Sequence, residues 1–71
     1  MAGHVEAWAD KRIVLAKMLN LRAGPSTRHR VIDVLVAETP VFPERHAGNW
    51  TLVRTPEGRV GWVYASLLTK P

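Results

Sequence analysis

Residues 20–27 read NLRAGPST, and the Gly24-Pro25 pair within this stretch interrupts the apolar pattern of the surrounding chain. An apolar run that begins at Ile13 precedes it, and a second run, VIDVLV at residues 31–36, follows it. Glycine next to proline favours a turn, whereas a short run rich in β-branched residues favours a strand. The stretch therefore predicts the start of a long loop that leaves one strand and leads into the next.

Two further strands are predicted around a tight turn. Residues 50–54 (WTLVR) and 59–64 (RVGWVY) flank the sequence TPEG, in which proline suits the second turn position and glycine the fourth. Another strand begins at Val41, but Pro43 cannot donate a hydrogen bond to a ladder, so this strand should lie at an edge or carry a bulge. A single 3₁₀ turn is expected at residues 65–68 (ASLL), which are too few for a longer helix.

These elements predict an all-β barrel or sandwich of about five antiparallel strands. No stretch after residue 12 has the length and period of a helix, which excludes a parallel βαβ arrangement. Residues 1–12 are expected to form an N-terminal extension, in which residues 4–12 have the spacing of a short helix and Trp8 serves as an apolar anchor. Residues 13–69 are expected to form the barrel.

The composition is that of a small folded domain with a basic surface. Of the 71 residues, 46% are apolar and three are tryptophan, which is more apolar material than disordered chains carry. The absence of cysteine excludes disulfides and thiolate metal sites. The net charge of +4 favours anionic partners such as nucleic acid, wall polymers or acidic proteins, although the basic residues are dispersed. No apolar run approaches the length of a membrane span.

Catalytic and metal chemistry have little support in the sequence. The hydroxyls of Ser26 and Ser66 would need a base in reach, and no histidine stands beside a carboxylate in a spacing that indicates a triad. The three histidines, His4, His29 and His46, also lack the spacing of a zinc site. We therefore expect no enzymatic activity, no metal and no cofactor.

Three motifs occur in an order that resembles bacterial Src-homology-3 (SH3) domains. Residues 20–26 fit the family pattern Asn-x-Arg-x-Gly-Pro-Ser, and residues 48–53 fit Gly-x-Trp-x-x-Val. Residues 58–63 fit Gly-x-x-Gly-Trp-Val, and a Ser-x-Leu sequence follows at the terminal turn. The resemblance covers roughly residues 13–69 and implies an SH3-like barrel.

The chain departs from the family pattern at two places. Residues 37–40 read AETP where relatives usually have a glycine in the turn, and Pro43 stands where relatives have a regular strand residue. The third strand and its turn are therefore expected to differ from those of relatives. Asn20 is expected to hydrogen-bond the backbone of the bend that opens the first loop.

Aromatic side chains on the last two predicted strands provide the candidate binding site. Because side chains alternate along a strand, an inward Val63 places Trp62 and Tyr64 on the outer face. In the same way, an inward Val53 leaves Trp50 on the outer face of its own strand. An exposed apolar patch of this kind usually marks a contact site. The alternative is that long loops fold over the rings and make them a second small core.

The resemblance implies a non-catalytic binding module that recognises cell-wall peptides or other extended ligands in a groove beside the first loop. Aromatic rings next to basic residues suit such a peptide, because rings provide contact area at low entropic cost. The residues predicted to form this site are Arg22, Asn49, Trp50, Trp62 and Tyr64. For Arg22, a structural role against the loop is favoured over a ligand contact.

Two alternative functions stay open at this point. A small basic barrel with aromatic residues can stack bases and neutralise phosphates, so nucleic acid is one alternative partner. The other alternative is a protein-protein interaction or assembly role in a larger protein, with the N-terminal extension as the contact. The N-terminus carries acidic residues where a signal peptide would be apolar, so the chain is read as cytoplasmic as given or as a module of an exported bacterial protein. The sequence does not fix the oligomeric state.

Overall fold

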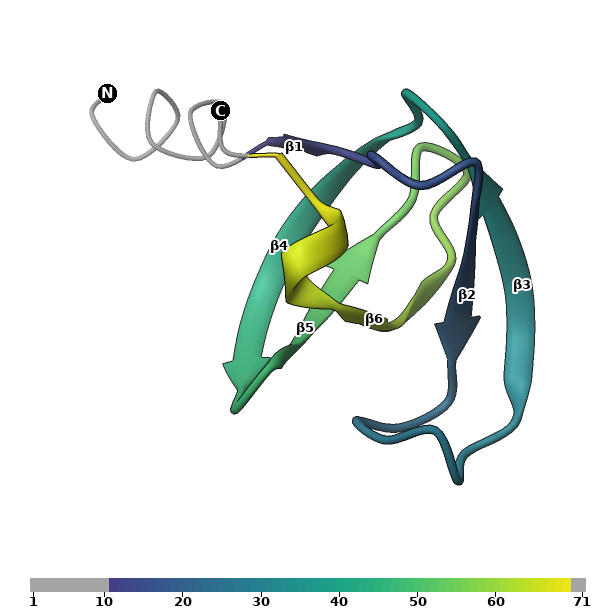
Figure 1. The fold of residues 1–71 in the computed structure, drawn as a ribbon, viewed down its shortest axis with the longest axis vertical. Coiled ribbons are helices and arrows are strands. Elements are labelled where there is room, and N and C mark those ends of the chain that lie inside the picture. Colours follow the sequence, from purple (N-terminus) through teal and green to yellow (C-terminus); the bar gives the residue numbers. More distant parts are fainter. Residues whose placement is uncertain (1–10, 70–71) are drawn as a thin grey trace.

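The computed structural model describes residues 11–69, which form six strands and one 3₁₀ turn (Figure 1). The all-β prediction is confirmed for these residues, with six strands in place of about five. The elements are β1 (Arg12–Ile13), β2 (Met18–Arg22), β3 (Val31–Val36), β4 (Pro40–Ala47), β5 (Trp50–Arg54), β6 (Val60–Tyr64) and η1 (Ala65–Leu67). Apart from its last two residues, the helix expected at residues 4–12 lies outside the described part, as does Trp8, and Arg12 belongs to β1.

The additional strand arises because the apolar run that begins at Ile13 bends at residues 14–17. Backbone hydrogen bonds hold this bend against the turn that precedes β4. The Val14 N–H donates to the Thr39 carbonyl at 3.0 Å, and the Glu38 N–H donates to the Val14 carbonyl at 2.8 Å. The bend thus depends on partners far away in the sequence, which local strand propensity cannot reveal.

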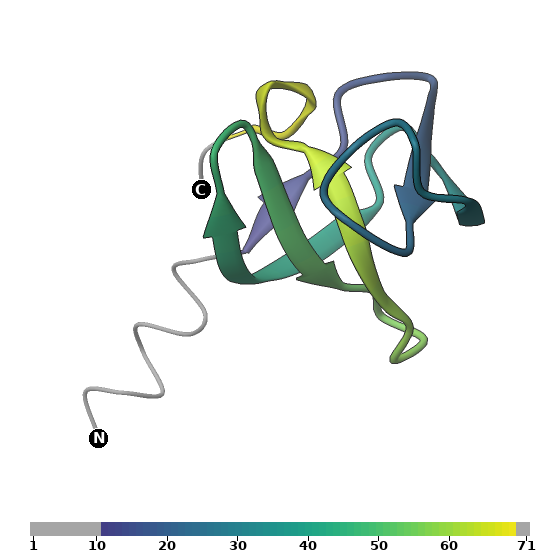
Figure 2. The same ribbon diagram turned by 90° about the horizontal axis from the view of Figure 1, so that it is seen from below.

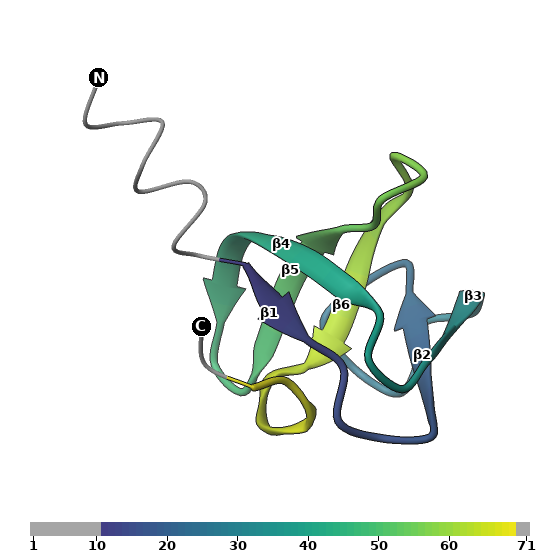
Figure 3. The same cartoon turned by 90° about the horizontal axis from the view of Figure 1, so that it is seen from above.

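The strands form one antiparallel sheet in the order β1-β4-β5-β6-β2-β3. β1 and β2 follow each other in the sequence, yet β1 pairs with β4 and β2 pairs with β6 and β3. The bend at residues 14–17 therefore carries the chain from β1 at one edge of the sheet to β2, which lies next to the other edge strand β3, and the sheet curls into a small barrel (Figures 2 and 3). The described chain also meets itself near its two ends, because the Thr69 N–H donates to the Ile13 carbonyl at 2.8 Å and the Ile13 N–H donates to Thr69 Oγ1 at 3.0 Å.

Seven aliphatic side chains from five strands and the bend fill the barrel. They are Val14, Leu19, Leu21, Leu35, Val41, Val53 and Val63. The predicted inward direction of Val53 and Val63 is confirmed, since both are completely buried. The alternation that places them inside directs their neighbours on β5 and β6 to the outer face, and this fixes the orientation of the aromatic residues.

Residue type accounts for two of three irregular backbone positions, at Gly58 and Pro43 but not at Glu38. The TPEG turn is closed by a hydrogen bond from the Gly58 N–H to the Thr55 carbonyl at 2.9 Å, and Gly58 has a φ of 89°. The bulge expected at Pro43 is confirmed by a register shift between Pro43 and Arg45. In the AETP turn, Glu38 adopts a φ of 71°, which a side chain disfavours and a glycine accepts.

No helix among residues 11–69 has the length and apolar character needed to cross a membrane.

Candidate ligand pocket beside the first loop

A hollow of about 250 Å³ lies between the loop at residues 23–30, the end of β6 and η1, and we call it the aromatic pocket. Its lining combines two aromatic rings, apolar side chains and one cation: Met18, Leu19, Asn20, Arg22, Thr27, Trp50, Tyr64 and Leu67. Three of the five residues predicted for the site, Arg22, Trp50 and Tyr64, come together here. Two other hollows of similar volume contain neither ring.

The two rings of the aromatic pocket form a fixed wall. Trp50 and Tyr64 are directly opposite each other on β5 and β6. Their ring centroids lie 5.5 Å apart and the ring planes meet at 83°, which is the edge-to-face arrangement that aromatic pairs prefer. Tyr64 is 40% exposed and Trp50 is half-buried. The prediction of an outer aromatic face is confirmed for this pair, and no loop buries Tyr64.

Arg22 holds the loop at residues 23–30 against the barrel. Its Nη1 group donates to the Thr27 carbonyl at 3.2 Å and to the His29 carbonyl at 2.9 Å. The structural role predicted for Arg22 is therefore confirmed. The loop begins at the Gly24-Pro25 pair and extends beyond the strands at the bottom of Figure 1, so a guanidinium that binds two of its carbonyls fixes its position.

Ser26 and His29 stabilise the loop from within. Ser26 Oγ accepts a hydrogen bond from the Arg28 N–H at 3.1 Å and is also hydrogen-bonded to His29 Nδ1 at 3.1 Å. The His29 ring packs against Gly24, where a β-carbon would overlap it. A serine and a histidine thus meet, but the hydroxyl serves the loop backbone, and the ion pairs and hydrogen bonds of residues 11–69 bring no carboxylate to His29.

The expectation for Asn20 is wrong. Its side chain makes no hydrogen bond to residues 11–69, since it lies in the middle of β2 on the exposed side and lines the aromatic pocket. Arg22, two residues further on and on the same face of β2, performs the tying role instead.

Asn49 and Trp62 lie outside the lining of the aromatic pocket. Asn49 is exposed in the turn between β4 and β5, where its carbonyl accepts a hydrogen bond from the Ala65 N–H at 2.8 Å. Trp62 is half-buried on β6 with Leu52 and Arg22 as its strand partners. Both residues therefore flank the pocket wall, and a ligand would have to extend over the sheet to reach them.

Apart from Arg22, sequence reasoning missed the pocket residues contributed by β2, the loop and η1. Met18 is 70% exposed and Leu67 36%, and both are apolar. The buried Leu19 and Leu21 carry a usable signal, since alternation along the strand places Met18, like Arg22, on the opposite face. Leu67 gives no such signal, because its place beside β2 depends on how the barrel closes.

Metal binding finds no support in the described part of the chain. No group of three or more histidine, cysteine, aspartate or glutamate side chains lies close enough together there to hold an ion. His46 Nδ1 is hydrogen-bonded to Thr51 Oγ1 at 3.0 Å, so this ring has a structural partner between β4 and β5.

The family model described as the bacterial SH3 domain matches residues 17–69, about three quarters of the chain. The match begins just before β2 and ends beyond η1, so it includes every residue that lines the aromatic pocket. No curated protein matches the sequence.

Proposed function

The chain belongs to the bacterial SH3 domain family, and from this premise we propose that residues 13–69 are a non-catalytic module that binds an extended peptide in the aromatic pocket. Membership of the family implies a binding-module fold. Peptides of the cell wall are the ligand class that the family resemblance favours. The observation that carries the proposal is the rigid pair Trp50 and Tyr64 beside the anchored loop.

The pocket has the physical properties that an extended peptide requires. Trp50 and Tyr64 are held by neighbouring strands and offer a large contact area with little loss of side-chain freedom on binding. Met18 and Leu67 add exposed apolar surface to the lining. The loop that forms the third wall is fixed by Arg22, so little ordering is needed when a ligand enters.

The test is a chemical-shift titration of the ¹⁵N-labelled protein with muropeptides and, separately, with short oligonucleotides. Muropeptides are expected to shift the Trp50 indole N–H and the backbone amides of Tyr64 and Leu67. Met18→Ala removes an exposed pocket side chain without opening the core and should weaken binding about tenfold or less. Leu15→Ala is the matched control, because Leu15 is similarly exposed and does not line the pocket.

Nucleic acid is the second candidate, and the net charge of +4 favours it. Salt dependence separates the two functions, since each neutralised phosphate makes affinity fall steeply with salt, whereas an apolar peptide contact responds weakly. Oligonucleotides that shift the pocket residues with a steep salt dependence, together with muropeptides that shift nothing, would contradict the peptide proposal.

A further inference from the structure

Arg22 uses only part of its guanidinium to hold the loop. Nη1 binds the two loop carbonyls, whereas Nη2 and Nε make no hydrogen bond to residues 11–69. A guanidinium carries five N–H donors in a fixed planar fork, so three of them are left over. The residue is half-buried and lines the aromatic pocket together with Trp50 and Tyr64.

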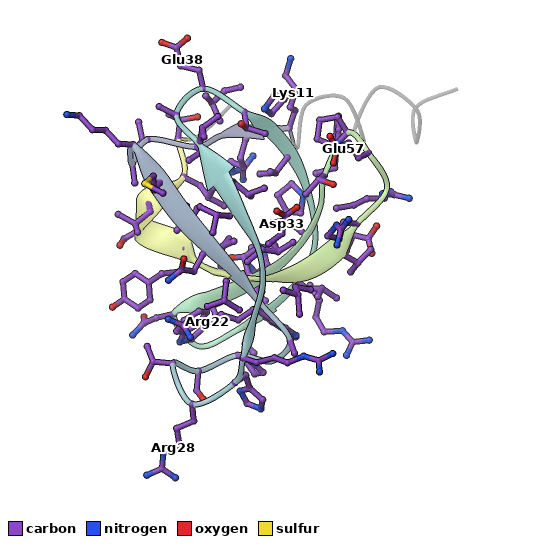
Figure 4. The ribbon with its side chains drawn as sticks, turned by 90° about the vertical axis from the view of Figure 1, so that its right-hand side faces the viewer. Lys11, Arg22, Arg28, Asp33, Glu38 and Glu57 are labelled. Carbon is purple, nitrogen blue, oxygen red and sulfur yellow. The ribbon has the colours of Figure 1, made fainter. Side chains whose placement is uncertain are left out.

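Arg22 also lacks a counter-charge in the described part of the chain. The two ion pairs found there are Arg54 with Glu44 at 2.9 Å and Arg59 with Asp33 at 3.4 Å. Figure 4 shows Asp33 and the other labelled acids on the upper half of the molecule and Arg22 on the lower half. A half-buried cation beside an apolar surface attracts an anion more strongly than an exposed one, because solvent screens it less.

Resting on the proposed function, we infer that the ligand of the aromatic pocket is a peptide with a carboxylate, to which Nε and Nη2 of Arg22 donate hydrogen bonds. The planar fork of arginine matches the two oxygens of a carboxylate, and such charge-assisted pairs are stronger than neutral hydrogen bonds. Because the Thr27 and His29 carbonyls already orient the guanidinium, binding requires no further ordering of this side chain.

The rest of the ligand lies over the apolar part of the pocket. A carboxylate at Arg22 leaves the adjoining residue of the peptide next to Tyr64 and Met18, which favours an apolar side chain there. The carboxylate can be the C-terminus of the peptide or an aspartate or glutamate side chain. The two sources share the same chemistry at Arg22 and differ in where the peptide continues.

The experiment is affinity selection of random hexapeptides by the immobilised protein, with one pool ending in a free carboxylate and one in a carboxamide. We expect selected peptides to be rich in acidic residues or to come from the free-acid pool. For an individual peptide, replacing the carboxylate by an amide should weaken binding about tenfold or more. Loss on amidation of the C-terminus assigns that source, and loss on Glu→Gln or Asp→Asn substitution in the peptide assigns the side chain.

Arg22→Gln and Arg28→Gln form a matched pair of variants for this test. Both remove one positive charge from the same region, but Arg28 does not line the pocket, and its side chain points away from the molecule in Figure 4. Arg22→Gln should abolish the preference for carboxylate, and Arg28→Gln should keep it within about twofold. Should Arg22→Gln lose its fold, the acid-to-amide ratio of the unaltered protein and the shift of the Arg22 Nε–H resonance still give the answer.

The results distinguish this inference from the proposed function. Selected peptides that are neutral or basic, with equal recovery from the two pools, would overturn the carboxylate and leave peptide binding intact. An equal loss in Arg28→Gln would also overturn it, since the effect would then follow net charge and not the pocket. Selection of no peptide that shifts Trp50 or Tyr64 would overturn the proposed function and the inference together.

Discussion

The loop at residues 23–30 and the turn at residues 55–58 both reverse the chain between strands, yet they are held in different ways. The turn is held by hydrogen bonds among residues 55–59 alone: the Gly58 N–H donates to the Thr55 carbonyl at 2.9 Å, the Thr55 N–H donates to the Arg59 carbonyl at 2.8 Å, and the Arg59 N–H donates to Thr55 Oγ1 at 3.1 Å. The loop also has backbone hydrogen bonds, such as the one from the Ala23 N–H to the Arg30 carbonyl at 3.0 Å, but the side chains of Arg22, Ser26 and His29 add hydrogen bonds that hold its shape and its position.

This difference indicates that the turn contributes mainly to the stability of the fold and the loop mainly to ligand binding. A turn closed by its own few residues contributes to the fold and tolerates side-chain change at its tip. A loop that also needs side chains to hold it can change its shape without loss of the sheet, and loops of this kind are where binding residues concentrate. The aromatic pocket accordingly lies beside the loop and not beside the turn.

Gly61→Ala should have the largest effect, because Gly61 lies where the strand from the turn meets the strand that leads to the loop. A β-carbon here would lie 2.6 Å from Leu21 Cγ and 3.0 Å from the Arg22 carbonyl oxygen. Leu21 is completely buried and cannot move aside. We expect the free energy of unfolding to fall by about 2–3 kcal/mol in chemical denaturation. Val60→Ala, at an exposed neighbouring position, is the control and should change it by less than about 1 kcal/mol.

Gly58→Ala tests how strongly the turn depends on the backbone conformation of Gly58. No atom lies within 4 Å of the added β-carbon, so the effect comes from the φ of 89°. A side chain in this region is disfavoured, and the unfolding free energy should fall by about 1–2 kcal/mol. Gly58→Asn should lower the free energy of unfolding by a smaller amount, because asparagine tolerates positive φ. An unchanged denaturation midpoint in Gly58→Ala would show that the turn is not limited in this way.

Gly24→Ala tests the loop through a side-chain contact, whereas Gly58→Ala tests the turn through its backbone conformation. The added methyl group would displace the His29 ring and break its hydrogen bond to Ser26. We expect the unfolding free energy to fall by only about 1 kcal/mol, with amide shift changes concentrated at residues 23–30. Adding His29→Ala to this variant removes the overlap and should restore most of the loop shifts. Changes that spread through the core strands would show that the loop is not separable from the sheet.

Glu38→Gly should have the smallest effect and the opposite sign. Glu38 adopts a φ of 71°, the kind of position that glycine accepts without strain, in the turn where the family usually has a glycine. Relief of this strain, less the greater freedom of glycine in the unfolded chain, should stabilise the protein by about 0.5 kcal/mol. Glu38→Gln removes the charge and keeps the strain, so its melting temperature should stay near that of the unaltered protein.

The sequence predicts the turn at residues 55–58 better than the loop for the same physical reason. TPEG carries its own turn chemistry, and alternation along β5 and β6 then orients Trp50 and Tyr64. Arg22 donates to backbone carbonyls, which every residue has, so no pattern of side chains in the sequence predicts these partners. The bend at residues 14–17 and the position of Leu67 depend on closure of the barrel, and short-range patterns contain no information about it.

The paired hydrogen bonds between Ile13 and Thr69 have a consequence for how this domain can be joined to other chains. They place Ile13 and Thr69, near the two ends of the described chain, side by side, so a host protein could carry the domain within a surface loop with its own two flanking residues left close together. Because these positions are close together, a short linker could join them and the chain could be cut elsewhere to give new termini. The turn at residues 48–49 is exposed and is one place for such termini.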